Sequence, residues 1–142
     1  GTFAEQDAEI LRDIGRWLAI NKEAVYSAKP WRIPAEGPTV EVEGQFSDAS
    51  ATAYTKEDFR FTAGNGCIYA ACLQYPEDGR LTIRALSKSS DSSKPNFHGI
   101  IRGVEILGFE EKPSFFVDGE GLHIHTHNVH SAFPVVMKIR VE

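Results

Sequence analysis

The sequence predicts an all-β fold: an antiparallel β-sandwich of about eight short strands, preceded by one N-terminal α-helix. Two observations lead to this prediction. After residue 39, apolar side chains recur mostly at every second position, in short runs separated by Gly-, Pro- and Asn-containing turns. Within the first 20 residues they recur instead at intervals of three and four, which is the period of a helix. Short strands joined by turns typically form two packed antiparallel sheets.

The predicted helix begins within the first few residues. Thr2 followed by Glu5 fits a capping box, in which each side chain accepts a backbone N–H at the helix start. We expect the helix to break at Asn21-Lys22. Its apolar stripe consists of Phe3, Ile10, Leu11, Ile14, Trp17 and Leu18. Because a wide apolar face seldom begins a chain, we expect this sequence to be the end of a longer protein.

The strands show period two most clearly in Phe133–Val141. Phe59 and Phe61 alternate with polar residues, and Gly64-Asn65-Gly66 predicts a hairpin turn after them. Cys67–Tyr75 is apolar on both parities, which indicates a strand covered on both faces. Leu122, Ile124 and Thr126 are expected to face the core.

Other segments are predicted from their turn and loop residues. Ile33–Pro38 carries two prolines and a glycine and is expected to be a linker. Pro76–Gly79 is expected to close a second hairpin, with Leu81, Ile83 and Ala85 inward on the strand that follows. Val40 and Val42 predict a short edge strand, 45–53 predicts a loop, and 87–96 predicts a mobile, low-complexity loop.

Composition and charge exclude several classes. The net charge of −5 has interspersed signs, so the chain lacks the basic face that a nucleic-acid partner needs. No apolar run approaches the roughly 20 residues that span a membrane. Cys67 and Cys72, five positions apart on one predicted strand, point to opposite faces and cannot bridge. We therefore expect neither a nucleic-acid partner nor a membrane partner. We expect both cysteines to be buried, free thiols.

Several short segments carry a family resemblance. In chain order they are Ile14–Leu18, Asn21–Tyr26, Lys29–Trp31, Tyr54-Thr55, Asp58–Thr62, Ile68–Ala70, Gly103–Gly108 and Gly121–Ile124. Together they resemble the end of the catalytic barrel and the C-terminal domain of retaining α-L-fucosidases. The resemblance implies that 1–31 is the terminal helix and junction of a (β/α) barrel, and that 32–142 is the C-terminal β-sandwich. The serine-rich 87–96 departs most from the family pattern.

The resemblance also implies a function. The parent enzyme would hydrolyse terminal α-L-fucosyl residues with retention and without a cofactor, and a periplasmic or extracellular location would be favoured, although the compartment stays open. This chain would be a structural accessory domain whose partner is the missing barrel. The alternative is a carbohydrate-binding module that targets the enzyme to glycans.

The chain itself is expected to lack catalytic residues. Retaining glycosidases need two carboxylates about 5–5.5 Å apart, and the resemblance puts both upstream of this chain. The local acid pairs, Glu110 with Glu111 and Asp118 with Glu120, are typical of solvated turns. We expect no cofactor.

Histidines and aromatic side chains are the weaker candidates for ligand sites. His123, His125 and His127 would project from one strand face about 7 Å apart, where imidazoles could hold zinc or nickel. We expect instead that they form an outward polar face and hold no metal. Four rings without a clear place in the core are candidates for sugar stacking. They are Trp31, Tyr75, Phe109 and Phe116.

The apolar stripe of the predicted helix needs a surface against which it can be buried. We expect the helix to fold back on the free face of Cys67–Tyr75, with Trp17 and Trp31 at the contact. The alternatives are self-association through the remaining stripe and fraying of the helix.

Overall fold

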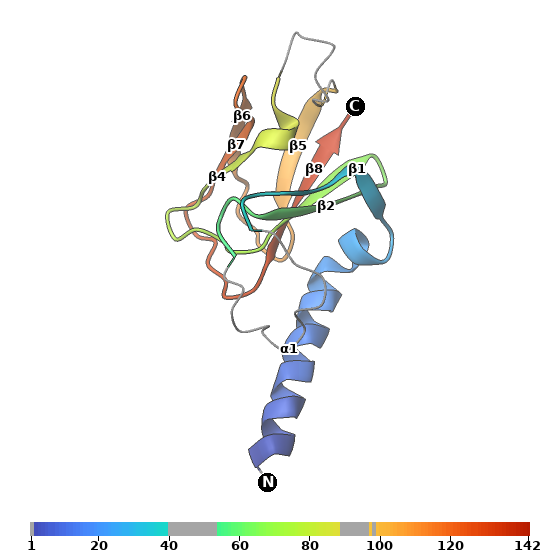
Figure 1. Cartoon of the computed structure of the whole chain (residues 1–142), viewed down its shortest axis with the longest axis vertical. Helices are drawn as coiled ribbons and strands as arrows, with labels where there is room; N and C mark the ends of the chain where they lie inside the picture. Colours follow the sequence, from blue (N-terminus) through green and yellow to red (C-terminus); the bar gives the residue numbers. More distant parts are fainter. Residues whose placement is uncertain (1, 40–53, 89–96, 98) are drawn as a thin grey trace.

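The structure, a computed structural model, describes residues 2–39, 54–88, 97 and 99–142. The expected edge strand at Val40–Val42, the loop at 45–53 and most of the serine-rich loop lie outside these residues. One long helix precedes two antiparallel sheets (Figure 1). The elements are α1 (Thr2–Val25), β1 (Lys29–Glu36), β2 (Phe59–Gly64), β3 (Cys67–Cys72), β4 (Arg80–Ile83), η2 (Arg84–Leu86), β5 (Ile101–Ile106), β6 (Ser114–Val117), β7 (Leu122–His125) and β8 (Val135–Val141).

The strands form a five-stranded sheet in the order β1-β2-β3-β8-β5 and a three-stranded sheet in the order β4-β7-β6. All pairings between neighbouring strands are antiparallel. The predicted fold class, one helix followed by an antiparallel β-sandwich, is therefore confirmed.

The main core lies between the two sheets and is built from the alternate residues of each strand that point inward. These side chains are the expected ones: on β7, Leu122 and Ile124 are buried while the histidines between them are not. Burying each large apolar side chain contributes about 1.5–3 kcal/mol. The largest fully buried members include Phe59, Ile83, Leu86, Leu122, Ile124, Met137 and Ile139.

Two of the predicted turns are hairpins. Asn65 and Gly66 both have positive φ (56° and 73°), which suits the twist between β2 and β3. The turn at Asp118 joins β6 and β7, where the Asp118 N–H donates to the Gly121 carbonyl over 3.1 Å. Cys67 and Cys72 are both buried and free, as predicted.

The second predicted hairpin, at Pro76–Gly79, is wrong. A turn does form, because the Gly79 N–H donates to the Pro76 carbonyl over 3.2 Å. However, β3 and β4 belong to different sheets, so this turn carries the chain across the sandwich. Gly79 has φ 69°, and a Cβ there would lie 2.1 Å from the Thr126 carbonyl oxygen. The turn thus needs glycine for both its conformation and its close approach.

The predicted linker at Ile33–Pro38 is wrong over most of its length. β1 runs from Lys29 to Glu36 and pairs with β2 at the edge of the five-stranded sheet. Edge strands tolerate proline, and the register shifts between Pro30 and Ala35. Strand β1 begins before residue 32. The division of the chain into 1–31 and 32–142 stays a prediction. Ala85, expected on a strand, lies in η2 instead.

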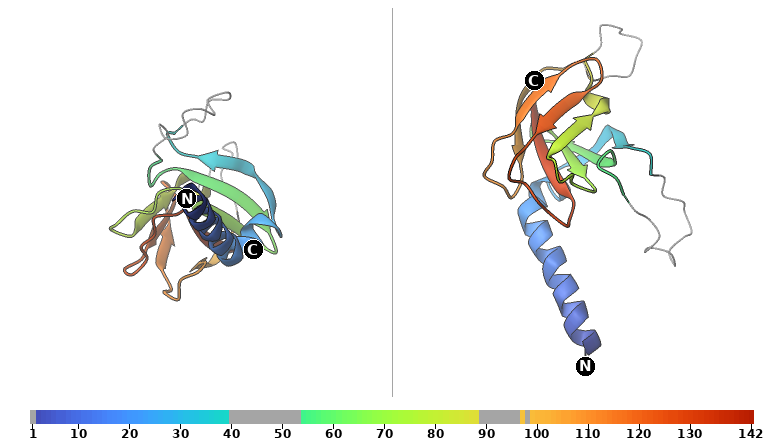
Figure 2. Two further views of the ribbon diagram at one scale, coloured as in Figure 1. Left: turned by 90° about the horizontal axis from the view of Figure 1, so that it is seen from below. Right: turned by 90° about the vertical axis from the view of Figure 1, so that its left-hand side faces the viewer.

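Helix α1 is continuous to Val25 but kinked at Asn21 (φ −107°, ψ 17°), where a break was predicted. Its first turns project away from the sandwich (Figures 1 and 2). Only the C-terminal part packs on the five-stranded sheet, against β2 and β8. Trp17 borders a second cluster there, formed by Ala24, Cys67, Tyr69 and Val136.

The expected docking on the free face of β3 is confirmed for the C-terminal part of α1, where Trp17 lies at the contact, but the first turns of the helix do not fold back. The expected role of Trp31 at this contact is wrong. Its ring packs at the edge of the main core, with its centroid 5.4 Å from that of Phe61. The free face of β3 is covered by the end of α1, together with Ala28 and Leu107. Of the helices in the described part of the chain, none combines the length and apolar character that a membrane crossing requires.

Candidate functional site

The outer face of the three-stranded sheet gathers three of the predicted ligand-binding side chains, His123, His125 and Phe116. Strand register forms two rows across β4, β7 and β6. Arg80, His125 and Ser114 make the first row, and Thr82, His123 and Phe116 make the second. Their neighbours along each strand, such as Leu81 and Ile124, point into the core. We call these six residues the outer face.

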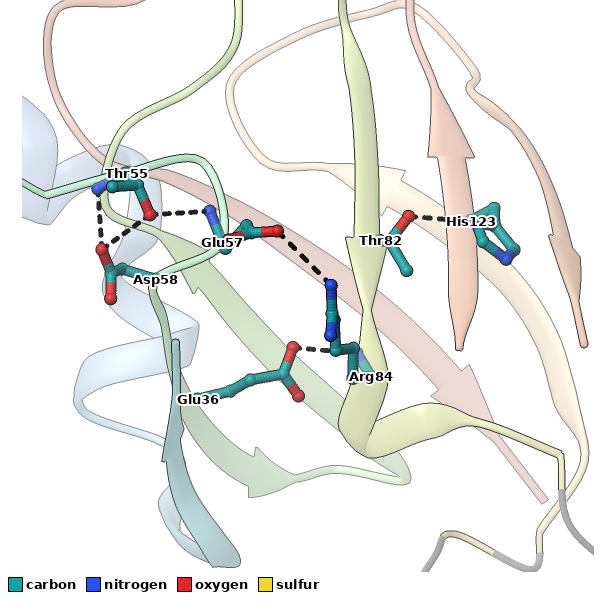
Figure 3. A network of polar contacts seen from close by, with 7 residues as sticks. All are labelled: Glu36, Thr55, Glu57, Asp58, Thr82, Arg84 and His123. Carbon is teal, nitrogen blue, oxygen red and sulfur yellow. Dashed lines mark hydrogen bonds and ion pairs between the residues drawn. The ribbon is translucent and has the colours of Figure 1, made fainter. Parts of the chain in front are cut away.

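His123 is the best-fixed residue of the outer face. Its Nε2 donates to Asp118 Oδ1 over 2.8 Å, and its Nδ1 is hydrogen-bonded to the Thr82 hydroxyl at 3.0 Å. Figure 3 shows the Thr82 contact. The ring stacks on Phe116, with centroids 4.6 Å apart and planes inclined by 24°. Both ring nitrogens and one ring face are thus engaged.

Only two members of the predicted histidine row, His123 and His125, belong to the outer face, because β7 ends at His125 and His127 lies in the bend that follows. His125 and His127 are neighbours, with ring centroids 4.4 Å apart, whereas His123 turns to Asp118. Within the described residues, no group of three His, Cys, Asp or Glu side chains is arranged to hold a metal ion.

The acidic side chains at the predicted turns accept backbone hydrogen bonds. Glu111 accepts the N–H groups of His127 and Asn128 over 2.7 and 2.5 Å, and the bond from His127 is the main cause that lowers its pKa. Asp118 accepts the N–H of Glu120, and the hydrogen bond from His123 chiefly lowers its pKa. These contacts hold the turns beside β7.

The four candidate sugar-stacking rings fall into different environments. Tyr75 is buried, and its hydroxyl is hydrogen-bonded to Thr126. Trp31 and Phe109 are half-buried at the margin of the core. Phe116 is 61% exposed and is the one candidate that presents its ring on the outer face. The structure thus favours Phe116 among the four.

Asp58 is a buried carboxylate that the sequence analysis did not single out. It is fully buried and accepts four hydrogen bonds of 2.7–2.9 Å from the N–H and hydroxyl groups of Thr39 and Thr55. Burial alone would raise the pKa of Asp58, but these bonds outweigh it and lower the pKa to about 2. Thr55 followed by Asp58 is a capping-box spacing, which was the available signal.

A second polar group lies beside Asp58 (Figure 3). Glu36 accepts the N–H groups of Arg84 and Ala85 over 2.8 and 2.6 Å, which ties β1 to η2. Glu57 forms an exposed ion pair with Arg84 at 3.4 Å. A pocket of about 470 Å³ opens here, between Lys56, Glu57, Thr82 and Arg84. These contacts connect the two sheets at one end of β4.

The other distinctive surface follows α1 and is apolar. Ile10, Leu11, Ile14 and Ile20 are 49–68% exposed. The stripe continues into a pocket of about 320 Å³ lined by Ile14, Trp17, Leu18, Phe133 and Pro134, with Asp13 at its border. We call these residues together the α1 surface. Beside it Asn21 is buried, and its Oδ1 has no hydrogen-bond partner among the described residues.

The fold is that of a β-sandwich domain with a protruding N-terminal helix. Comparison with known families places it more closely: residues 52–139 match the model of the α-L-fucosidase C-terminal domain. The chain belongs to this family, as its sequence segments indicated.

Curated relatives agree over the same region. The chain is 32% identical over 82 residues to tissue α-L-fucosidase of Rattus norvegicus, which covers 58% of this chain and 14% of that protein. It is 36% identical over 75 residues to α-L-fucosidase of Branchiostoma floridae, covering 53% and 13% respectively. The chain therefore spans only a small part of the length of these relatives.

Solved structures share the fold. An α-L-fucosynthase of Thermotoga maritima superimposes with a TM-score of 0.61 at 19% identity, over 95% of this chain and 26% of that one. The Thermotoga maritima α-fucosidase in complex with fucose gives a TM-score of 0.57 at 19% identity, over 88% and 24%. In the first, the similarity extends over nearly the whole chain.

Proposed function

We propose that this chain is the structural C-terminal domain of a longer, retaining α-L-fucosidase-like glycosidase, and that α1 packs against the catalytic domain. The longer enzyme would hydrolyse terminal α-L-fucosyl residues. Family membership and the small share of the relatives that the chain spans support this proposal. The barrel is the partner that we assign to the domain.

The α1 surface is the observation that carries the proposal. Ile10, Leu11 and Ile14 form a continuous apolar strip that leads to the Trp17 pocket. Each such side chain gains about 1.5–3 kcal/mol on full burial, so a partner surface would stabilise the helix considerably. Asn21, whose Oδ1 has no hydrogen-bond partner among the described residues, follows Trp17 by one helical turn.

The acids of the domain support a non-catalytic role. A retaining mechanism needs one free carboxylate as nucleophile and one carboxyl group as acid. Glu111 and Asp118 instead accept backbone N–H groups in turns, and Asp58 is enclosed by its threonine partners. We therefore assign the catalytic pair to the remainder of the longer enzyme.

The experiment compares two substitutions on α1 in the longer enzyme. Ile14→Asp places a charge on the α1 surface, and Ala19→Asp places the same charge about 140° around the helix. Ile14→Asp should lower the melting temperature of the enzyme and its α-L-fucosidase activity, whereas Ala19→Asp should change neither. Equal effects of the two variants would contradict the proposed packing.

Carbohydrate binding is the second candidate function, and one observation favours it. Phe116 is an exposed aromatic ring beside hydrogen-bonding side chains. Binding to a glycan array by the 142-residue chain distinguishes this role from a purely structural one.

A further inference from the structure

We propose that the outer face of the three-stranded sheet binds an acidic oligosaccharide, with a sugar ring on Phe116 and a carboxylate or sulfate group on Arg80. This inference names the ligand and the site for the second candidate function, and it does not depend on the packing of α1. It rests on the rigidity of the ring, the placement of the donors and the balance of charge.

The Phe116 ring is held in place from one side. His123 stacks on it, and His123 is itself fixed by Asp118 and Thr82 on two neighbouring segments. The ring is nevertheless 61% exposed, on the edge strand β6. A ring that is already ordered loses little entropy on binding, and its apolar surface suits the C–H groups of a sugar ring.

Hydrogen-bond donors lie in the next row of the same face. Arg80, His125 and Ser114 are opposite one another on the three strands. Two residues along a strand correspond to about 7 Å, and two strand spacings to about 10 Å. A groove of about 390 Å³ joins the two rows, with Arg80, Thr82, His125 and Phe116 in its lining. Arg80 and Phe116 are thus far enough apart for a ligand of two or more sugar residues.

The charges of the outer face favour an anionic ligand. Within the described part of the chain, the Arg80 guanidinium has no hydrogen bond or ion pair, and only its backbone N–H is bonded, to Asp78. Two acids beside β7 already have partners: Asp118 holds His123, and Glu111 holds two backbone N–H groups. A guanidinium carries five donors and no acceptor, so a carboxylate or sulfate complements it directly.

The test is binding of the 142-residue chain to an array of neutral, uronate-containing, sialylated and sulfated glycans, followed by titration with the strongest acidic binder. We expect binding to at least one acidic class and weaker binding to its uncharged analogue. Phe116→Ala and Arg80→Gln should each weaken binding at least tenfold. Tyr26→Ala is the matched control, because Tyr26 is 71% exposed on the segment that follows α1.

Three outcomes would overturn the inference: no acidic glycan binds, neutral analogues bind equally well, or the two variants bind like the unmodified chain. Thermal melting of each variant verifies that it folds, which is expected because Phe116 and Arg80 are both exposed. α-L-Fucosidase activity of the longer enzyme is compatible with each of these outcomes. Failure of glycan binding would therefore not contradict the proposed structural role of the domain.

Discussion

The indole nitrogen of Trp17 donates a hydrogen bond to the carbonyl oxygen of Pro134 over 2.7 Å, joining α1 to the loop before β8. The same part of the helix is held by Glu23, whose Oε2 accepts from the Tyr69 hydroxyl at 2.8 Å and pairs with Lys138 at 2.8 Å. These three polar contacts and one small apolar cluster therefore fix the direction in which the first turns of α1 leave the sandwich.

Replacing Trp17 tests the first of these contacts. Trp17→Phe keeps an aromatic ring but removes the N–H donor, and should lower the free energy of unfolding by about 1 kcal/mol, as measured by urea denaturation. Ile10→Ala, on the exposed part of the stripe, is the control and should cost less. An unchanged midpoint for Trp17→Phe would mean that the bond to Pro134 does not hold the helix.

Asp58 predicts a pH dependence of stability. Its pKa is about 2 in the folded chain and near 3.8 when unfolded, so the unfolded state binds the proton more readily. The carboxylate thus contributes about 2 kcal/mol above pH 5, and this contribution is lost as the pH falls from about 4 to 2. Urea unfolding between pH 2 and 6 measures it.

The control for this prediction is Asp58→Asn. An amide cannot ionise, and the variant should be less stable than the unmodified chain at pH 6, with a shallower decline in acid. If the two stability profiles run parallel between pH 4 and 2, Asp58 is not the group responsible.

The isolated chain should not hydrolyse an aryl α-L-fucoside, because Asp58, Glu111 and Asp118 all accept backbone N–H groups and we assign the catalytic pair to the remainder of the longer enzyme. The measurement is release of nitrophenol between pH 4 and 8. Turnover that persists through repurification and disappears on mutating Glu110, Glu111, Asp118 or Glu120 would refute the assignment of an accessory domain.

The histidines should take up zinc only weakly. His123 is engaged at both ring nitrogens, so a metal would have to displace Thr82 or Asp118. Micromolar zinc should raise the melting temperature by no more than about 1 °C by linkage. A rise of several degrees that His125→Ala abolishes would establish a metal site.

Local patterns in the sequence predict a large part of this fold. The alternation in 133–141 gives β8 its inward residues, and Asn65-Gly66 places a hairpin where both residues have positive φ. Leu122, Ile124 and Thr126 are buried as expected because period two separates them from the histidines. These features depend on neighbours in sequence, and therefore a single chain reveals them.

Features that depend on distant segments were missed. The turn at Pro76–Gly79 looks like a hairpin, but β4 pairs with β7, about 40 residues later, which no local pattern encodes. Lys29–Glu36 forms a strand despite its prolines because it lies at a sheet edge. Of the four candidate rings, only a three-dimensional arrangement identifies Phe116 as exposed beside donors. Asp58 likewise becomes notable through Thr39, far from it in sequence.

Hydrogen exchange of α1 tests the central claim most directly. The backbone amides of residues 8–20 are measured in the isolated, monomeric chain and in the longer enzyme under the same conditions. If the catalytic domain covers the α1 surface, these amides should exchange at least 100-fold more slowly in the longer enzyme, while those of β7 and β8 change little. Equal exchange rates for residues 8–20 in both proteins would contradict the account.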